Sequence, residues 1–208
     1  MHANRSLPLR AVVAAATAAV ALLVSALSGH HTTGAATALR ATASAHVKTT
    51  TDKHNQADVT FAQTMILHHR QAIGMAEMAR TRASSSDVKT LAVKVKKEQA
   101  PEIRTMVGWL NAWGEKVPRG MYGMRHGHPS DMAGMMNKNE MHALNRASGK
   151  SFDTMFLAMM IKHHEGAVQM ARTEKKHGSY GPAKALANRI VITQTAEIAQ
   201  MRKILQTS

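Results

Sequence analysis

The chain has 208 residues, an apolar fraction of 44% and a formal net charge of +14, which suit one domain of ordinary size with a single core. It has no cysteine, which excludes disulfides, thiolate zinc sites and iron–sulfur clusters. A soft-metal site would therefore depend on methionine sulfur, and methionine is abundant, with 16 residues against an aromatic fraction of 3%.

The positive charge predicts attraction to anionic envelope polymers or lipid headgroups. Nucleic acid is not expected as a partner, because aromatic residues are not interleaved with the basic ones and no nucleic-acid-binding module is recognisable. The sequence leaves the oligomeric state open.

Residues 1–28 have the features of a secretory signal. Arg5 and Arg10 precede an almost wholly apolar run over residues 11–27, an order typical of an export signal or, without cleavage, of an N-terminal anchor. The protein is therefore expected to be secreted or extracytoplasmic.

Residues 29–54 are rich in Thr, Ala and Ser without an apolar period, which predicts a flexible linker. Cleavage after Ser28 would make Gly29-His30-His31 the new N-terminus. A free amine with histidine in third place suits square-planar Cu(II).

Residues 55–208 contain an internal duplication. Asp58 aligns with Asp153, 95 residues later, and the same offset continues without a gap as far as Met106 and Met201. The chain therefore contains two copies of one unit. Under this offset Phe61, Met65, His68, His69 and Met75 align with Phe156, Met160, His163, His164 and Met170, and Gln99 and Glu102 align with Gln194 and Glu197.

Each copy is expected to form two helices, because its apolar residues recur at three- and four-residue steps. Ser84-Ser85-Ser86 interrupts the pattern in the first copy, and residues 178–182, which contain Gly and Pro, interrupt it in the second. Two antiparallel hairpins can bury their apolar stripes against each other, so the sequence predicts an all-α four-helix bundle. Pro101 predicts a kink or restart in one copy only, since its equivalent is Ala196.

The segment that connects the copies, residues 115–149, is rich in methionine and histidine. Because it also contains glycines, its thioethers are expected to be exposed beside imidazoles, a combination that suits Cu(I). Asn137 is predicted to cap a short helix that ends at Gly149. The candidate ligands of this segment are Met121, Met124, His126, His128, Met132, Met135 and Met136.

The duplicated His-His pairs predict a second metal site inside the bundle. Adjacent helical residues point about 100° apart, so one imidazole of each pair is expected to face inward with the methionines while its neighbour flanks the interface. Two alternatives remain: the methionines could be core residues, and the glutamates could orient the imidazoles by hydrogen bonds. The candidate ligands are His68, His69, His163, His164, Met65, Met75, Met160 and Met170, with Glu102, Glu197, Met106 and Met201 from the partner helices.

Catalytic activity is not expected. A di-iron bundle needs a Glu-x-x-His spacing on each of two helices, whereas this spacing occurs at Glu174 and His177 without a counterpart in the first copy. Neither a nucleophile motif nor a glycine-rich phosphate loop is visible.

The repeated motif Phe-x3-Met-Ile-x-His-His, at residues 61–69 and 156–164, resembles the exported family called domain of unknown function 305. The resemblance covers roughly residues 55–206 and implies a ferritin-like four-helix fold. Some members are associated with copper binding outside the cytoplasm and with copper tolerance. One departure is Arg70-Gln71, where the second copy has Glu165-Gly166, so equal metal affinity of the two copies is not expected.

Together these features predict an exported protein that sequesters or carries copper through His and Met ligands. Cu(I) is favoured, with Cu(II) as the alternative. A metal-free surface bundle, whose basic face interacts with other envelope components, is the alternative function.

Overall fold

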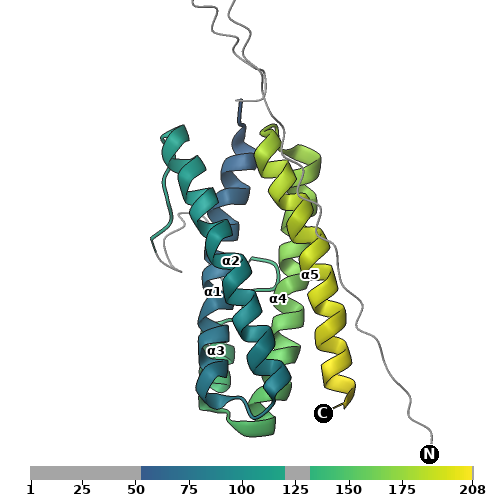
Figure 1. The fold of residues 1–208 in the computed structure, drawn as a ribbon. Helices are drawn as coiled ribbons and strands as arrows, with labels where there is room; N and C mark the ends of the chain where they lie inside the picture. Colours follow the sequence, from purple (N-terminus) through teal and green to yellow (C-terminus); the bar gives the residue numbers. More distant parts are fainter. Residues whose placement is uncertain (1–52, 120–131, 208) are drawn as a thin grey trace, which may run out of the picture. The chain divides into compact units, whose positions relative to one another are not determined.

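The computed structural model describes residues 53–119 and 132–207 (Figure 1). The predicted all-α class is confirmed, and none of the described helices is long and apolar enough to cross a membrane. The predicted signal and nearly all of the predicted linker lie outside the described residues, as do Met121, Met124, His126 and His128. The described helices are α1 (Gln56–Arg82), α2 (Ser86–Trp113), α3 (Lys138–Arg146), α4 (Gly149–His177) and α5 (Gly181–Thr207).

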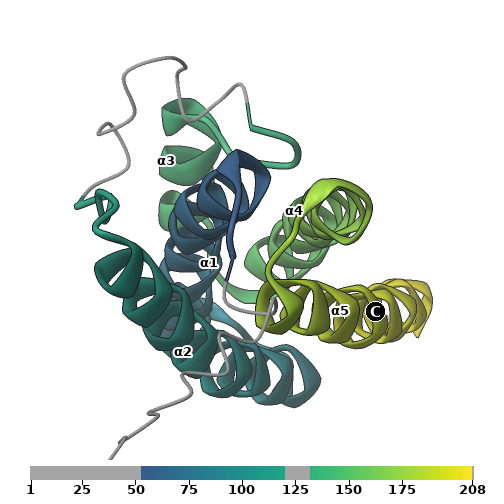
Figure 2. The same ribbon diagram turned by 90° about the horizontal axis from the view of Figure 1, so that it is seen from above.

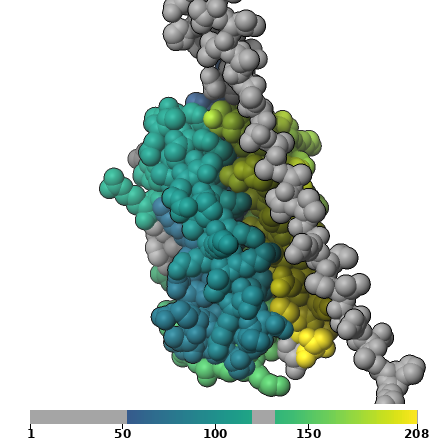
Figure 3. Space-filling view, in the orientation of Figure 1, coloured from purple at the N-terminus to yellow at the C-terminus, as the bar shows by residue number. Residues whose placement is uncertain are grey.

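The bundle consists of two helical hairpins, one from each copy of the repeat. Helix α1 pairs with α2 and α4 pairs with α5, while α1 and α4 join the two hairpins at the centre (Figure 2). Helices α2 and α5 lie on the flanks, and their surfaces border each other on the face shown in Figure 3. The hairpin turns fall where the sequence breaks predicted them, and α2 continues through Pro101 without a restart.

Two equivalent aspartates, one in each hairpin, accept hydrogen bonds from the turn of the other hairpin. Asp58 on α1 accepts hydrogen bonds from the backbone N–H groups of Ser179 and Tyr180, at 3.1 and 2.9 Å. Asp153 on α4 accepts from the backbone N–H of Ser85, at 2.9 Å, and from Ser84. Because these N–H groups precede α5 and α2, where no intrahelical partner exists, the aspartates satisfy donors that would otherwise be lost.

Helix α3 begins as predicted and ends earlier than predicted. Asn137 caps it, with its side chain accepting from the backbone N–H of Glu140 at 2.9 Å while the Glu140 carboxylate accepts from the Asn137 N–H. The helix ends at Arg146 rather than Gly149, because Gly149, at a φ of 60°, already begins α4.

Candidate metal centre

The two copies of the repeat meet at a pair of histidines. His68 on α1 and His163 on α4 are both fully buried, and their ring centroids are 3.6 Å apart with the ring planes tilted by 40°. Because α1 and α4 are equivalent helices, this contact joins the same position of each copy. The inward-facing imidazoles are therefore the first member of each His-His pair.

The second member of each pair contacts a glutamate on the other helix of its own hairpin. His69 Nε2 lies 2.6 Å from Glu102 Oε2, and His164 Nε2 lies 2.9 Å from Glu197 Oε2. Both imidazoles are fully buried. The contacts match the alternative in which the glutamates hold and orient the imidazoles.

The two histidine–glutamate pairs differ in their surroundings. The Glu197 side chain is 2% exposed and its Oε1 binds Lys94 Nζ at 3.1 Å, whereas the Glu102 side chain is 19% exposed. Burial raises the pKa of Glu197, but the hydrogen bonds from His164 and Lys94 outweigh it and lower that pKa below its usual value. Glu197 is therefore held as a carboxylate, and the two copies are not electrostatically equivalent.

Buried ring nitrogens without a hydrogen-bond partner are concentrated at this centre. Among the described residues, His163 has no partner at either nitrogen, and the Nδ1 atoms of His68, His69 and His164 have none either. His68 Nε2 contacts the Ala133 carbonyl oxygen at 3.2 Å. An unsatisfied buried polar atom costs about 1–3 kcal/mol, so a core that tolerates several of them has lone pairs available for a ligand.

The central imidazoles are neutral at neutral pH. Burial holds the pKa of His68 and of His163 well below the usual histidine value, and repulsion from the neighbouring imidazoles lowers it further. A neutral imidazole keeps a lone pair on one nitrogen, which is the form that coordinates metal ions.

The candidate methionines of the helices are divided between two core clusters on either side of the histidines. One cluster contains Met65 and Met106, with the partly buried Met170 packed against it. The other contains Met75, Met160 and Met201. Because α1 and α4 are antiparallel (Figure 1), each cluster takes methionines from both copies, and the six candidate methionines of the helices are not gathered in one cluster.

The prediction that the thioethers of the connecting segment are exposed is wrong for the part of the segment that the structure describes. Met135 and Met136 are 3% and 2% exposed, and Met132 is half-buried. The Gln71 side chain accepts from the Met136 backbone N–H and donates to the Met136 carbonyl, both at 2.8 Å. The tertiary contacts of α1 therefore draw this part of the segment into the core.

In the described parts of the chain, no three His, Asp or Glu side chains lie close enough together to hold a metal ion. A closed site of hard nitrogen and oxygen ligands, as zinc or Mn²⁺ prefers, is therefore not formed there. The buried imidazole pair offers nitrogen ligands instead, and the methionine clusters offer soft thioethers, a combination that suits Cu(I).

A polar cleft of about 360 Å³ lies between α2 and α5, and the glutamates of both histidine–glutamate pairs line it. It is lined by Glu102, Glu197, Glu98 and two buried glutamines, Gln99 and Gln194, whose Oε1 atoms have no hydrogen-bond partner. Burial and repulsion from Glu197 raise the pKa of Glu98. Sequence reasoning did not single out Glu98 or either glutamine as a candidate site residue, although the glutamines recur in both copies.

Known families and structures resemble this chain over most of its described length. The family model of the domain of unknown function 305 (DUF305) matches residues 58–205. A DUF305 protein from Streptomyces coelicolor, described as secreted, has 32% identity and a TM-score of 0.66, over 73% of this chain and 93% of that one. The comparison with curated proteins gives no match.

Structures of CopM are also similar. CopM in the Cu(II)-bound form has 36% identity and a TM-score of 0.62, covering 72% of this chain and 96% of CopM. CopM in the Cu(I)-bound form has 31% identity and a TM-score of 0.60, with the same coverage of both chains.

Proposed function

The chain belongs to the DUF305 family, and from that premise we propose that it binds copper as a cargo outside the cytoplasm, to sequester or carry the ion. The observation on which the proposal depends is the cluster of buried imidazole nitrogens without hydrogen-bond partners around His68 and His163. The similarity to copper-bound CopM supports copper as the metal.

The favoured oxidation state is Cu(I). The neutral imidazoles of His68 and His163 would supply nitrogen ligands, and the methionines of the two core clusters would supply soft thioethers. Thioethers select Cu(I) over harder ions. Cu(II) is the alternative, and the carboxylates Glu102 and Glu197 would serve it better.

The cleft between α2 and α5 is the proposed path of the ion. Its wall carries three carboxylates against one cation, Arg189, so its net charge attracts a cation, and two of the carboxylates contact His69 and His164 directly. A copper ion that enters there would reach the second histidine of each pair before the central two.

Cargo binding rather than catalysis is proposed because the central imidazoles are fully enclosed by the helices, with no exposed surface. The extracytoplasmic location is supported by the secreted relative and by the signal-like residues 1–28.

A Cu(I) competition titration under anaerobic conditions tests the proposal. The double variant His68→Gln/His163→Gln should bind Cu(I) at least about tenfold more weakly than the wild type, since each substitution removes one coordinating nitrogen and keeps a polar side chain. The matched control is His142→Gln/His177→Gln, which changes two exposed histidines and should leave the affinity unchanged.

A third variant separates the bundle from the connecting segment. Replacing Met121, Met124, His126 and His128 by serine should leave the tight binding step in place. If this variant loses Cu(I) binding while the His68/His163 variant keeps it, the bundle is not the copper site. Far-UV circular dichroism on every variant establishes that the fold is retained.

A further inference from the structure

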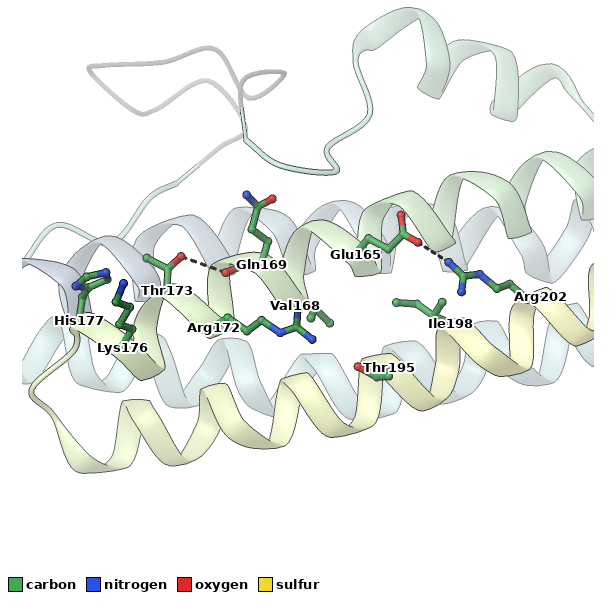
Figure 4. A pocket seen from close by; sticks show the side chains of 10 residues that line it. All are labelled: Glu165, Val168, Gln169, Arg172, Thr173, Lys176, His177, Thr195, Ile198 and Arg202. Atoms are coloured by element: carbon green, nitrogen blue, oxygen red, sulfur yellow. Dashed lines mark hydrogen bonds and ion pairs between the residues drawn. The ribbon is translucent and has the colours of Figure 1, made fainter.

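The outer face of the second hairpin contains a groove that the copper proposal does not use. It runs between α4 and α5, with a volume of about 600 Å³ (Figure 4). Four of its lining residues carry or can carry positive charge, namely Arg172, Lys176, His177 and Arg202. Glu165 is the acidic residue of this lining.

Two cations of the groove, Arg172 and Lys176, are available to a ligand, whereas Arg202 is already paired. Arg202 is held at one end by Glu165, with 2.8 Å between Arg202 Nη2 and Glu165 Oε1. Within the described structure, the side chains of Arg172 and Lys176 make no hydrogen bond or ion pair, and both residues are exposed. Figure 4 shows Arg172 and Arg202 extending into the space between the two helices, with Lys176 and His177 at the other end.

The internal duplication shows that this charge is not required by the fold. The first-copy equivalents of Arg172, Lys176 and Arg202 are, in that order, Glu77, Thr81 and Val107. The same helix-pair geometry therefore exists in one chain with and without the three cations. Glu77 is itself paired with Lys96, and the cations of the first copy stand at other positions, Arg70 and Arg82, which are the equivalents of Glu165 and His177.

The spacing of the cations fits an extended ligand rather than a single small ion. Arg172 and Lys176 are four residues apart on one helical face, about 6 Å along the axis. From Glu165, where Arg202 is held, to Lys176 is about 16 Å of helix. A linear ligand with negative charges along its length could contact all of these positions.

We propose that the α4–α5 groove binds a linear polymer of phosphate groups. Phosphate is favoured because each group offers several acceptor oxygens. The groove presents guanidinium groups from both walls, the Lys176 ammonium, the His177 imidazole and the Thr195 hydroxyl. Arginine forks match pairs of phosphate oxygens with two parallel hydrogen bonds. Such binding would hold the copper-carrying bundle on a phosphate-rich surface.

The test is the binding of fluorescently labelled linear inorganic polyphosphate to the full chain, measured by anisotropy at several salt concentrations. The wild type should bind, and its affinity should fall as salt rises, because phosphate contacts release counterions. Arg172→Glu/Lys176→Glu should weaken binding at least about tenfold.

The matched control is Lys89→Glu/Lys97→Glu, which makes the same change of net charge at two exposed positions of α2. It should weaken binding by less than about threefold. An equal loss in both double variants would show attraction to net charge alone and overturn the proposal, as would the absence of binding by the wild type. Equally tight binding of poly-glutamate of matched charge would overturn the assignment to phosphate. All substitutions are at exposed positions, and circular dichroism checks the fold.

Discussion

Gly166→Ala should destabilise the protein by about 3 kcal/mol or more, the scale of a severe packing defect. A Cβ atom at Gly166 would lie 1.9 Å from the Ala133 carbonyl oxygen and 2.8 Å from the Gly134 Cα. Both are backbone atoms, so no side-chain rotation relieves the overlap. The segment over residues 132–136 must therefore move away from α4.

The cost is large because several buried interactions depend on that segment. Its displacement would break the contact of His68 with Ala133 and the two hydrogen bonds of Gln71 with Met136. It would also expose Met135 and Met136. Each buried hydrogen bond contributes about 1 kcal/mol, and loss of a buried methionine from the core costs about 2 kcal/mol or more.

Urea denaturation followed by far-UV circular dichroism measures the effect. The matched control is Gly108→Ala, because Gly108 is an exposed helical glycine whose added Cβ would meet nothing within 4 Å. The control should raise stability by about 0.5–1 kcal/mol, the gain expected from replacing glycine in a helix. If Gly166→Ala unfolds at the same urea concentration as the wild type, the segment is not held against α4 in the way described.

The hairpins and their pairing could be predicted because the same helical pattern occurs twice in the sequence. The shared offset of Asp58 and Asp153 and the helical spacing of Phe61, Met65 and His69 define the same amphipathic unit in each copy. Two copies of one hairpin have few ways to bury equivalent stripes. That is why the expected bundle and the turns agree with the structure.

Which histidine of each pair meets its equivalent could not be predicted from helical phase. The first and second histidines are about 100° apart around the axis, and either could face the interface. The choice depends on how α1 crosses α4, which sequence spacing does not determine. The structure places His68 against His163 and directs His69 toward Glu102.

The burial of Met135 and Met136 was missed for a related reason. Gly134 and the other glycines nearby favour a loop, and loops are usually exposed. The burial depends on residues far away in the chain, since Gly166 leaves room for the Ala133 backbone and Gln71 pairs with Met136. Position 71 and position 166 are equivalent in the repeat, but one is Gln and the other is Gly. This difference between the two copies marks the place where the connecting segment packs against α1 and α4.

Glu174 supplies the second large prediction, a loss of stability as the pH rises. This carboxyl group is 1% exposed on α4 and has no equivalent in the first copy, where Ala79 occupies the position. It lies beside Asp58 at the Gly178 turn, since a Cβ at Gly178 would be 2.1 Å from Glu174 Oε1 and 2.8 Å from Asp58 Oδ1. Burial, followed by the effect of the neighbouring Asp58 carboxylate, raises the pKa of Glu174 to about 8.

The direction of the change in stability with pH follows from the difference between the pKa of Glu174 in the folded state and its pKa in the unfolded state. Folded Glu174 keeps its proton up to about pH 8, with Lys184 opposing this only weakly, whereas the unfolded chain releases it near the ordinary value of 4.5. Between these values the folded state binds one more proton, so its stability falls with rising pH. The pKa of Asp58 is lowered, and its contribution changes only at more acidic pH, outside this interval.

Glu174→Gln should remove this pH dependence. The amide is neutral at every pH, as the protonated acid is over this interval, so the variant should match the wild type near about pH 5 and exceed it by about 3 kcal/mol near about pH 8. Urea denaturation at a series of pH values measures the difference. Glu165→Gln, which alters an exposed carboxylate on the same helix, should keep the slope of the wild type. A slope that persists in Glu174→Gln would mean that another group binds the proton, and that the pair with Asp58 does not govern stability in this interval.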